Sequence, residues 1–452
     1  MQAAITAKGE KKKSEYGALV FFAAVLIAVY LARDIFTIPV PEIVITGWCA
    51  LAFFILDVGD GLAIFALCLP LTVPQNEINI AYLVVMIVKL FIISNKPVRF
   101  GALSVTVIAL ILLIEMFNEF FYTTGTAFTA LYNIVLIALP VIIPLIWYTC
   151  SEDFSREKIR NATYLFLIGV LIYTGIILYQ AVQVQGWSVI LSGNNRLGQH
   201  LEYETASDMR SRGNTNGISS LAATAFSLLL VVFDKKMLNR AVSLAGMIYF
   251  FFIVALTRSR GAELCLVAAV IIYALVVSRR RGNFVKALLI LAAFAVAITA
   301  LVMLFPSLWD GIIGRFVDQD DITNGRLDIA KEYIDALSSD FRGFLIGYGV
   351  KTYSGVVGAT NSPHNILVDI LVCWGIIGFV LVFWWLIMML AGNLSRVDKK
   401  DRLIVTLPAA VGLLGRMNGQ YTTMITEHLI LCFVIMTALV CAKDETEGRT
   451  MT

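Results

Sequence analysis

One histidine lies where a polar segment of the chain runs into a long apolar one. It is His364, one of three histidines in 452 residues, and Ser362 and Pro363 precede it. Serine followed by proline is typical of a helix N-cap and a first helical residue. The positive end of the helix dipole would favour a neutral imidazole, which can accept a proton from a hydroxyl group. His364 is therefore a candidate general base. The alternative is a histidine at the membrane interface that only caps or hydrogen-bonds.

Arginines near the ends of predicted membrane spans form a second candidate group. They lie on the side of the membrane that basic residues usually avoid, so their placement calls for a reason. The paired N–H donors of a guanidinium fit the oxygens of a phosphate, so phosphate or diphosphate is the ligand that we expect. The candidate residues for binding the diphosphate or its sugar are Arg212, Arg260, Arg326 and Asn216, supported by Arg258.

Some of these residues also have a purely structural interpretation. Arg260 and Glu263 are spaced so that their side chains can pair on adjacent turns of one helix, and on spacing alone this pairing is the simpler reading. Asn216 can belong to a turn and helix N-cap. Arg258 is expected to point away from Arg260, and to tolerate substitution better, if a helix begins at Arg260.

Two further candidates follow His364. Asp369 is a carboxylate within the apolar segment, where ionisable side chains are rare and often functional. Gly375 lies about three helical turns after His364, on the same helix face, and would let another helix approach closely. The acidic residues at 318–321 are more typical of a solvated turn than of a metal site, so we predict neither a metal nor a cofactor.

The composition predicts the elements that carry these residues. The chain is 59% hydrophobic and 15% charged, with a mean hydropathy of +0.83, which indicates a polytopic membrane protein. Apolar runs of about 20 residues cross a bilayer. They occur at about 17–33, 42–56, 61–73, 79–95, 101–117, 127–149, 162–183, 217–233, 239–256, 261–278, 284–304, 364–390, 402–417 and 425–441. We therefore predict an all-α protein with about 12–14 transmembrane helices.

Basic residues set the predicted orientation. Most of the 35 Lys and Arg residues fall in alternate short loops and in the tails, which places those segments in the cytoplasm. The cytoplasmic tails are then 1–16 and 443–452, around a single transmembrane domain at 17–442. Two large loops, about 184–216 and 305–363, lie outside, and an amphipathic surface helix is predicted at 324–339 within the second. All seven cysteines lie in or beside apolar runs, so no disulfide framework is predicted.

Several motifs in a fixed order resemble the O-antigen ligase and O-antigen polymerase superfamily. They are RGNTNG (212–217), SRGAEL (259–264), NGRLDIAKEYI (324–334), GYGVKTY (347–353) and PHNILVDILVCWG (363–375). The resemblance implies a fold of the GT-C type and a polyprenyl-diphosphate-linked glycan donor at the outer face of the bacterial plasma membrane. It matches Arg212, Arg260 and Arg326 to the family's basic positions and His364 to its outer-loop histidine. It implies neither a nucleotide sugar nor a cofactor.

The resemblance leaves the acceptor open. A polymerase would extend a lipid-linked repeat unit, whereas a ligase would transfer the finished glycan to lipid A core or another acceptor. The number of spans and the large second outer loop favour a polymerase. A transporter of lipid-linked sugars is the alternative from another class, but transporters usually contain internal repeats, and the sequence shows none. Membrane lipid and a chain-length regulator protein are expected partners, and nucleic acid is not.

Overall fold

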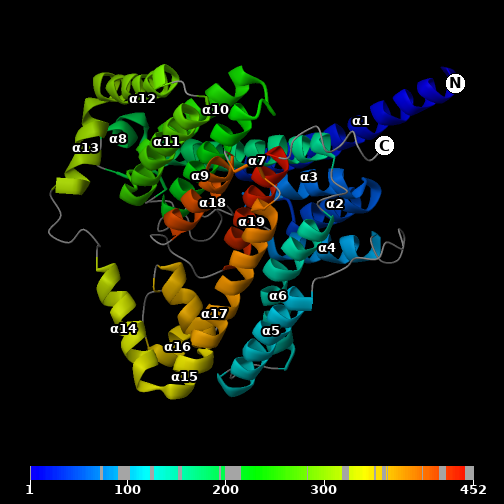
Figure 1. Cartoon of the computed structure of the whole chain (residues 1–452), viewed down its shortest axis with the longest axis vertical. Coiled ribbons are helices and arrows are strands. Elements are labelled where there is room, and N and C mark those ends of the chain that lie inside the picture. Colours follow the sequence, from blue (N-terminus) through cyan, green and yellow to red (C-terminus); the bar gives the residue numbers. More distant parts are fainter. Residues whose placement is uncertain are drawn as a thin grey trace. The chain divides into compact units, whose positions relative to one another are not determined.

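The chain folds into helices joined by loops. The computed structural model describes residues 2–71, 75–89, 102–122, 127–150, 155–192, 195–198, 215–281, 284–317, 325–350, 353–358, 363, 365–395, 397–399, 401–416 and 424–442, and it contains no strand within them. The helices (Figure 1) are α1 Gln2–Asp34, α2 Glu42–Ile55, α3 Val58–Cys68, α4 Gln75–Ile87, α5 Ala102–Tyr122, α6 Ala127–Cys150, α7 Arg156–Gln185, α8 Trp187–Leu191, α9 Thr215–Asp234, α10 Arg240–Thr257, α11 Arg260–Arg281, α12 Phe284–Leu304, α13 Pro306–Val317, α14 Arg326–Ser339, α15 Phe341–Ile346, α16 Tyr353–Val357, α17 Ile366–Leu394, α18 Arg402–Arg416 and α19 Met424–Ala442.

The predicted fold class is confirmed. Every apolar run predicted as a span overlaps a helix. Among the described residues, eight helices are long and apolar enough to cross a membrane, and they lie in α1, α5, α7, α9, α10, α11, α12 and α17. Shorter apolar helices occur in α2, α3, α4, α18 and α19. The protein is an all-α polytopic membrane protein.

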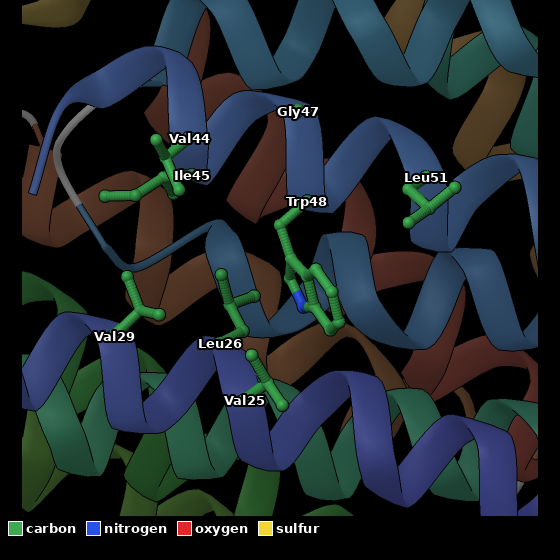
Figure 2. Close-up of a pocket in the computed structure, with 8 residues that line it drawn as sticks. All are labelled: Val25, Leu26, Val29, Val44, Ile45, Gly47, Trp48 and Leu51. Carbon is green, nitrogen blue, oxygen red and sulfur yellow. The ribbon is translucent and has the colours of Figure 1, made fainter.

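One compact unit comprises Met1–Arg99, Thr149–Val184 and His200–Arg212. Helices α3 and α7 approach closely within it, because a Cβ at Gly169 would lie 2.4 Å from the Leu67 carbonyl oxygen. Helices α1 and α2 line an apolar pocket of about 240 Å³ (Figure 2). Its lining residues are Val25, Leu26, Val29, Val44, Ile45, Gly47, Trp48 and Leu51. The pocket contains none of the charged groups expected at a functional site.

The second unit comprises Phe100–Tyr148, Gln185–Gln199 and Gly213–Thr452. Its central helix is α9, in which every residue from Ile218 to Val232 is buried. Helices α10, α11, α18 and α19 pack against it. The hydroxyl of Thr224 donates a 2.7 Å hydrogen bond to the Ser220 carbonyl, so a polar side chain is satisfied inside an apolar packing. All of the predicted site residues that the structure describes belong to this unit.

The segment at 305–363, which was predicted to be an outer loop, contains more helix than predicted. The amphipathic helix is confirmed as α14, which buries Ala330, Tyr333 and Leu337 on one face. Helices α13, α15 and α16 accompany it. The predicted helix start at Pro363 is wrong, because α17 begins at Ile366. The side-chain oxygen of Asn365 caps that helix by accepting from the Leu367 amide at 2.9 Å.

Candidate functional site: an arginine cluster and a kinked helix

The junction between α10 and α11 supports an arginine cluster. Helix α10 ends at Thr257, and Arg258 follows it in the left-handed region, with φ 47° and ψ 44°. Helix α11 then begins at Arg260. A side chain in the left-handed region costs about 1–2 kcal/mol, and such strain is concentrated at functional sites. Because of this tight turn, Arg258 and Arg260 both lie close enough to Arg315 to interact with its charge.

Hydrogen bonds bring other segments to this junction. Arg196 donates from Nε to the Thr257 carbonyl at 2.9 Å and from Nη2 to Oδ1 of Asn216 at 3.1 Å. Arg260 donates from Nη1 to the Arg315 carbonyl at 3.1 Å, which ties the end of α13 to the start of α11. The predicted site residue Asn216 therefore lies in the first turn of α9 and holds an arginine in place.

The pKa values show that the guanidinium groups share one environment. Burial and then repulsion from neighbouring arginines lower the pKa of Arg196 to about 9 and that of Arg258 to about 10. The same causes lower the pKa of Arg315 and of Arg326, and the positive charge of Arg260 contributes to both decreases. Among the described residues, Glu263 is the carboxylate that opposes these shifts at Arg196, Arg258 and Arg315. We refer to Arg196, Arg258, Arg260, Arg315 and Arg326 as the arginine cluster.

The arginine cluster has donors that the protein leaves unused. Within the part of the chain that the structure describes, the Nε atoms of Arg258 and Arg315 are buried without a hydrogen-bond partner. Neither carboxylate oxygen of Glu263 has a hydrogen-bond partner there either, so Arg260 and Glu263 interact through their charges but form no hydrogen bond. A buried guanidinium N–H without an acceptor is costly. An anion bound between these arginines would satisfy the donors and reduce the mutual repulsion.

The surroundings of Arg258 are more specific than the sequence indicated. The sequence predicted that this side chain points away from Arg260 if a helix begins there, and α11 does begin at Arg260. Arg258 is 4% exposed and lies within electrostatic reach of Arg315 and Glu263. The left-handed turn between the two helices, which the sequence did not reveal, gives it this position. Sequence reasoning did not select Arg196 and Arg315, the other two arginines of the cluster that lie outside the predicted ligand set.

Gly375 allows the close helix approach that was predicted, and it also introduces a kink that was not. It adopts φ 63° and ψ −170° and interrupts α17. A Cβ there would lie 2.3 Å from the Leu345 carbonyl carbon, and a Cβ at Gly347 would lie 2.3 Å from the Cys373 backbone. Only glycine allows this backbone-to-backbone contact. The close neighbour of Gly375 is thus the last turn of the short helix α15.

Polar residues in α5 support this contact, and sequence reasoning missed them. Glu115 and Asn118 are 0% exposed and hydrogen-bond to the turn and to α17. The available signal was a carboxylate and an amide on one face of an otherwise apolar span, because polar side chains within spans usually have a specific partner.

Asp369 lies in the first half of α17 and is 2% exposed. Neither of its carboxylate oxygens has a hydrogen-bond partner among the described residues. Burial and the charge of Asp369 contribute to raising the pKa of Tyr333 to about 12. The Tyr333 ring packs edge-on against that of Tyr353, with centroids 5.8 Å apart. Tyr333 belongs to α14, whose first residue is Arg326 of the arginine cluster, so one helix links the cluster to the surroundings of Asp369.

Two predicted site residues, His364 and Arg212, lie outside the described residues, as do residues 318–321. The structure therefore brings together Arg258, Arg260 and Arg326, with Asn216 attached through Arg196. No group of three or more metal-ligating side chains occurs in the described ranges.

The fold and the site define the class of protein. It is a polytopic helical membrane protein in which a cluster of arginines forms a potential anion-binding site. Residues 245–383, from α10 into α17, match the family described as O-antigen ligase (Wzy_C). The match confirms the resemblance to the O-antigen ligase and polymerase superfamily, whose members are glycosyltransferase-like enzymes of O-antigen assembly. No curated protein gives a significant match. The matched segment contains Arg258, Arg260, Glu263, Arg315, Arg326, Asp369 and Gly375.

Proposed function

We propose that the chain is a polymerase of a bacterial surface polysaccharide. It would transfer a glycan from a polyprenyl-diphosphate carrier to a lipid-linked repeat unit at the outer face of the plasma membrane. The observation that carries this proposal is the arginine cluster, with its buried Nε donors on Arg258 and Arg315. A diphosphate presents several anionic oxygens, which match a group of fixed guanidinium donors.

The proposed reaction is an inverting displacement. The acceptor hydroxyl attacks the anomeric carbon, the bond from that carbon to the diphosphate oxygen breaks, and the diphosphate leaves with the electron pair. Negative charge grows on the leaving group as the bond breaks, and positioned arginines stabilise that charge. His364 is the proposed general base and takes the hydroxyl proton. Neither a metal nor a cofactor has a step in this scheme.

Deletion of the gene followed by gel analysis of surface glycan tests the choice of acceptor. A single repeat unit on the final acceptor supports the polymerase. Full-length glycan that remains on the lipid carrier would instead identify an O-antigen ligase, which is the second candidate because the matching family is described by that name.

Turnover by the purified protein separates an enzyme from a transporter. In nanodiscs there is no second compartment, so transport leaves no product, whereas a transferase joins donor and acceptor. We expect a longer lipid-linked glycan from a synthetic diphosphate-linked donor. Unchanged donor and acceptor would favour the transporter. Membrane lipid and a chain-length regulator remain proposed partners.

A further inference from the structure

Helix α5 contributes a carboxylate that accepts hydrogen bonds from two segments, the turn after α15 and α17. Oε1 of Glu115 accepts a hydrogen bond from the Val350 amide at 3.0 Å, and Oε2 accepts from Nε1 of Trp374 at 2.8 Å. Val350 belongs to the turn after α15, and Trp374 to α17. Both oxygens of this fully buried carboxylate therefore act as acceptors for N–H groups that would otherwise be unsatisfied.

Asn118, about one turn further along α5, contacts the same two segments. Its Nδ2 donates to the Ile346 carbonyl at 2.8 Å and to the Cys373 carbonyl at 3.3 Å. Both acceptors are backbone oxygens at places where a helix ends or breaks, since α15 ends at Ile346 and α17 is interrupted at Gly375. We refer to Glu115 and Asn118 as the α5 clamp.

The kink in α17 explains why the α5 clamp is needed. The interruption at Gly375 removes regular helical partners from the preceding carbonyls. The Tyr348 amide donates to the Val372 carbonyl at 2.8 Å, and the Gly349 amide donates to the Cys373 carbonyl at 2.9 Å. The turn thus completes the broken helix, and the α5 clamp holds the turn and the break together. The first half of α17 is fixed in direction by these contacts.

We propose that Glu115 and Asn118 are positioning residues for the transfer reaction. They act by fixing the direction of the α17 segment that begins at Ile366, two residues after the proposed base His364, and that carries Asp369. The inference rests on the proposed function. The segment from Ile366 to Cys373 is about 10 Å long, so a tilt of about 6° at the kink moves its far end by about 1 Å. A displacement of that size can reduce a rate by about 10²-fold.

Substitutions at the α5 clamp can test whether it positions α17 for the transfer reaction or only stabilises the fold. Glu115→Gln keeps the side-chain size, but a glutamine amide has only one acceptor oxygen. Its NH2 group would therefore face the N–H of either Val350 or Trp374, and the two donors would clash. Trp374→Phe removes the indole donor, so the combination of the two substitutions relieves that clash. Met116→Leu is the matched control, because Met116 is a neighbour in α5 whose side chain is 49% exposed.

The experiment measures transfer by the full-length protein in nanodiscs, together with hydrogen exchange of the peptide that contains Tyr348, Gly349 and Val350. For Glu115→Gln we expect kcat to fall by about 10- to 100-fold, with KM for the donor within twofold of wild type, because the arginines lie on other elements. Exchange should accelerate in this peptide alone. The double variant should recover part of both losses.

Two results would overturn the proposal. One is a wild-type kcat in Glu115→Gln despite faster exchange at the turn. The other is a loss of kcat with faster exchange throughout the protein and no recovery in the double variant. Absence of transfer by the wild-type protein would contradict the proposed function itself and this inference with it.

Discussion

Replacing Arg258 by lysine tests the arginine cluster most directly. The substitution keeps one positive charge and the long apolar stem but removes Nε and the planar fork. Arg258 is 4% exposed, and its Nε has no hydrogen-bond partner among the described residues. A hydrogen bond from a charged group to a diphosphate contributes about 1.5–3 kcal/mol. Loss of one such contact should lower turnover by about 10- to 100-fold.

The pH dependence adds a second signature. Burial and the neighbouring arginines lower the pKa of Arg258 to about 10, so the wild-type side chain stays charged well above neutral pH. A lysine starts from a pKa of about 10.4, and the same environment stabilises its neutral form. Activity of Arg258→Lys should therefore decline as pH rises, at a lower pH than in wild type. The assay is glycan transfer in nanodiscs across a pH series.

Two controls separate charge recognition from backbone conformation. Arg240→Lys alters an exposed arginine at the opposite end of α10 and should leave turnover unchanged. Arg258→Gly relieves the left-handed strain and should retain a normal melting temperature while losing activity. Wild-type turnover and pH profile in Arg258→Lys would refute a role for this guanidinium in binding the diphosphate.

Three other predictions concern the helix kink, the general base and the orientation. Gly375→Ala should sharply reduce the yield of folded protein in detergent, measured by size-exclusion chromatography, because its Cβ would lie 2.3 Å from backbone atoms. Gly355→Ala is the control and should not reduce the yield, because no atom lies within 4 Å of a Cβ there. Equal yields of the two variants would contradict the close contact at Gly375. His364→Gln should lose turnover by about 10²- to 10⁴-fold but still bind the lipid-linked donor, since an amide cannot accept the proton; near-normal turnover would leave His364 with an orienting role. A cysteine introduced at Ser338 should react with a membrane-impermeant thiol reagent in cells whose plasma membrane is intact and whose outer membrane, if there is one, is permeabilised, and one at Ser278 should not. The reverse pattern would overturn the external active site.

Much of the fold follows from local properties of the sequence. A hydrophobic run of sufficient length forms a helix in a bilayer because its backbone polar groups must pair within the segment. The apolar runs therefore located the helices without any knowledge of their packing. The amphipathic period of α14 likewise predicted the buried face that includes Tyr333. Arginines on the predicted outer side led us to expect an anion site, because the distribution of charge between loops is also visible in sequence.

Tertiary structure decided which residues meet. The left-handed conformation of Arg258 and the convergence of Arg196 and Arg315 depend on how α10, α11 and α13 pack, and no spacing rule contains that information. Gly375 was visible in the sequence as a glycine in a span, but the end of α15 that it accommodates lies elsewhere in the chain. Glu115 satisfies amide and indole donors from two segments far from it in sequence. A buried hydrogen bond is fixed by distance in space, whereas helix formation is fixed by neighbours along the chain, and this is why the sequence predicted the elements while the fold decided the site.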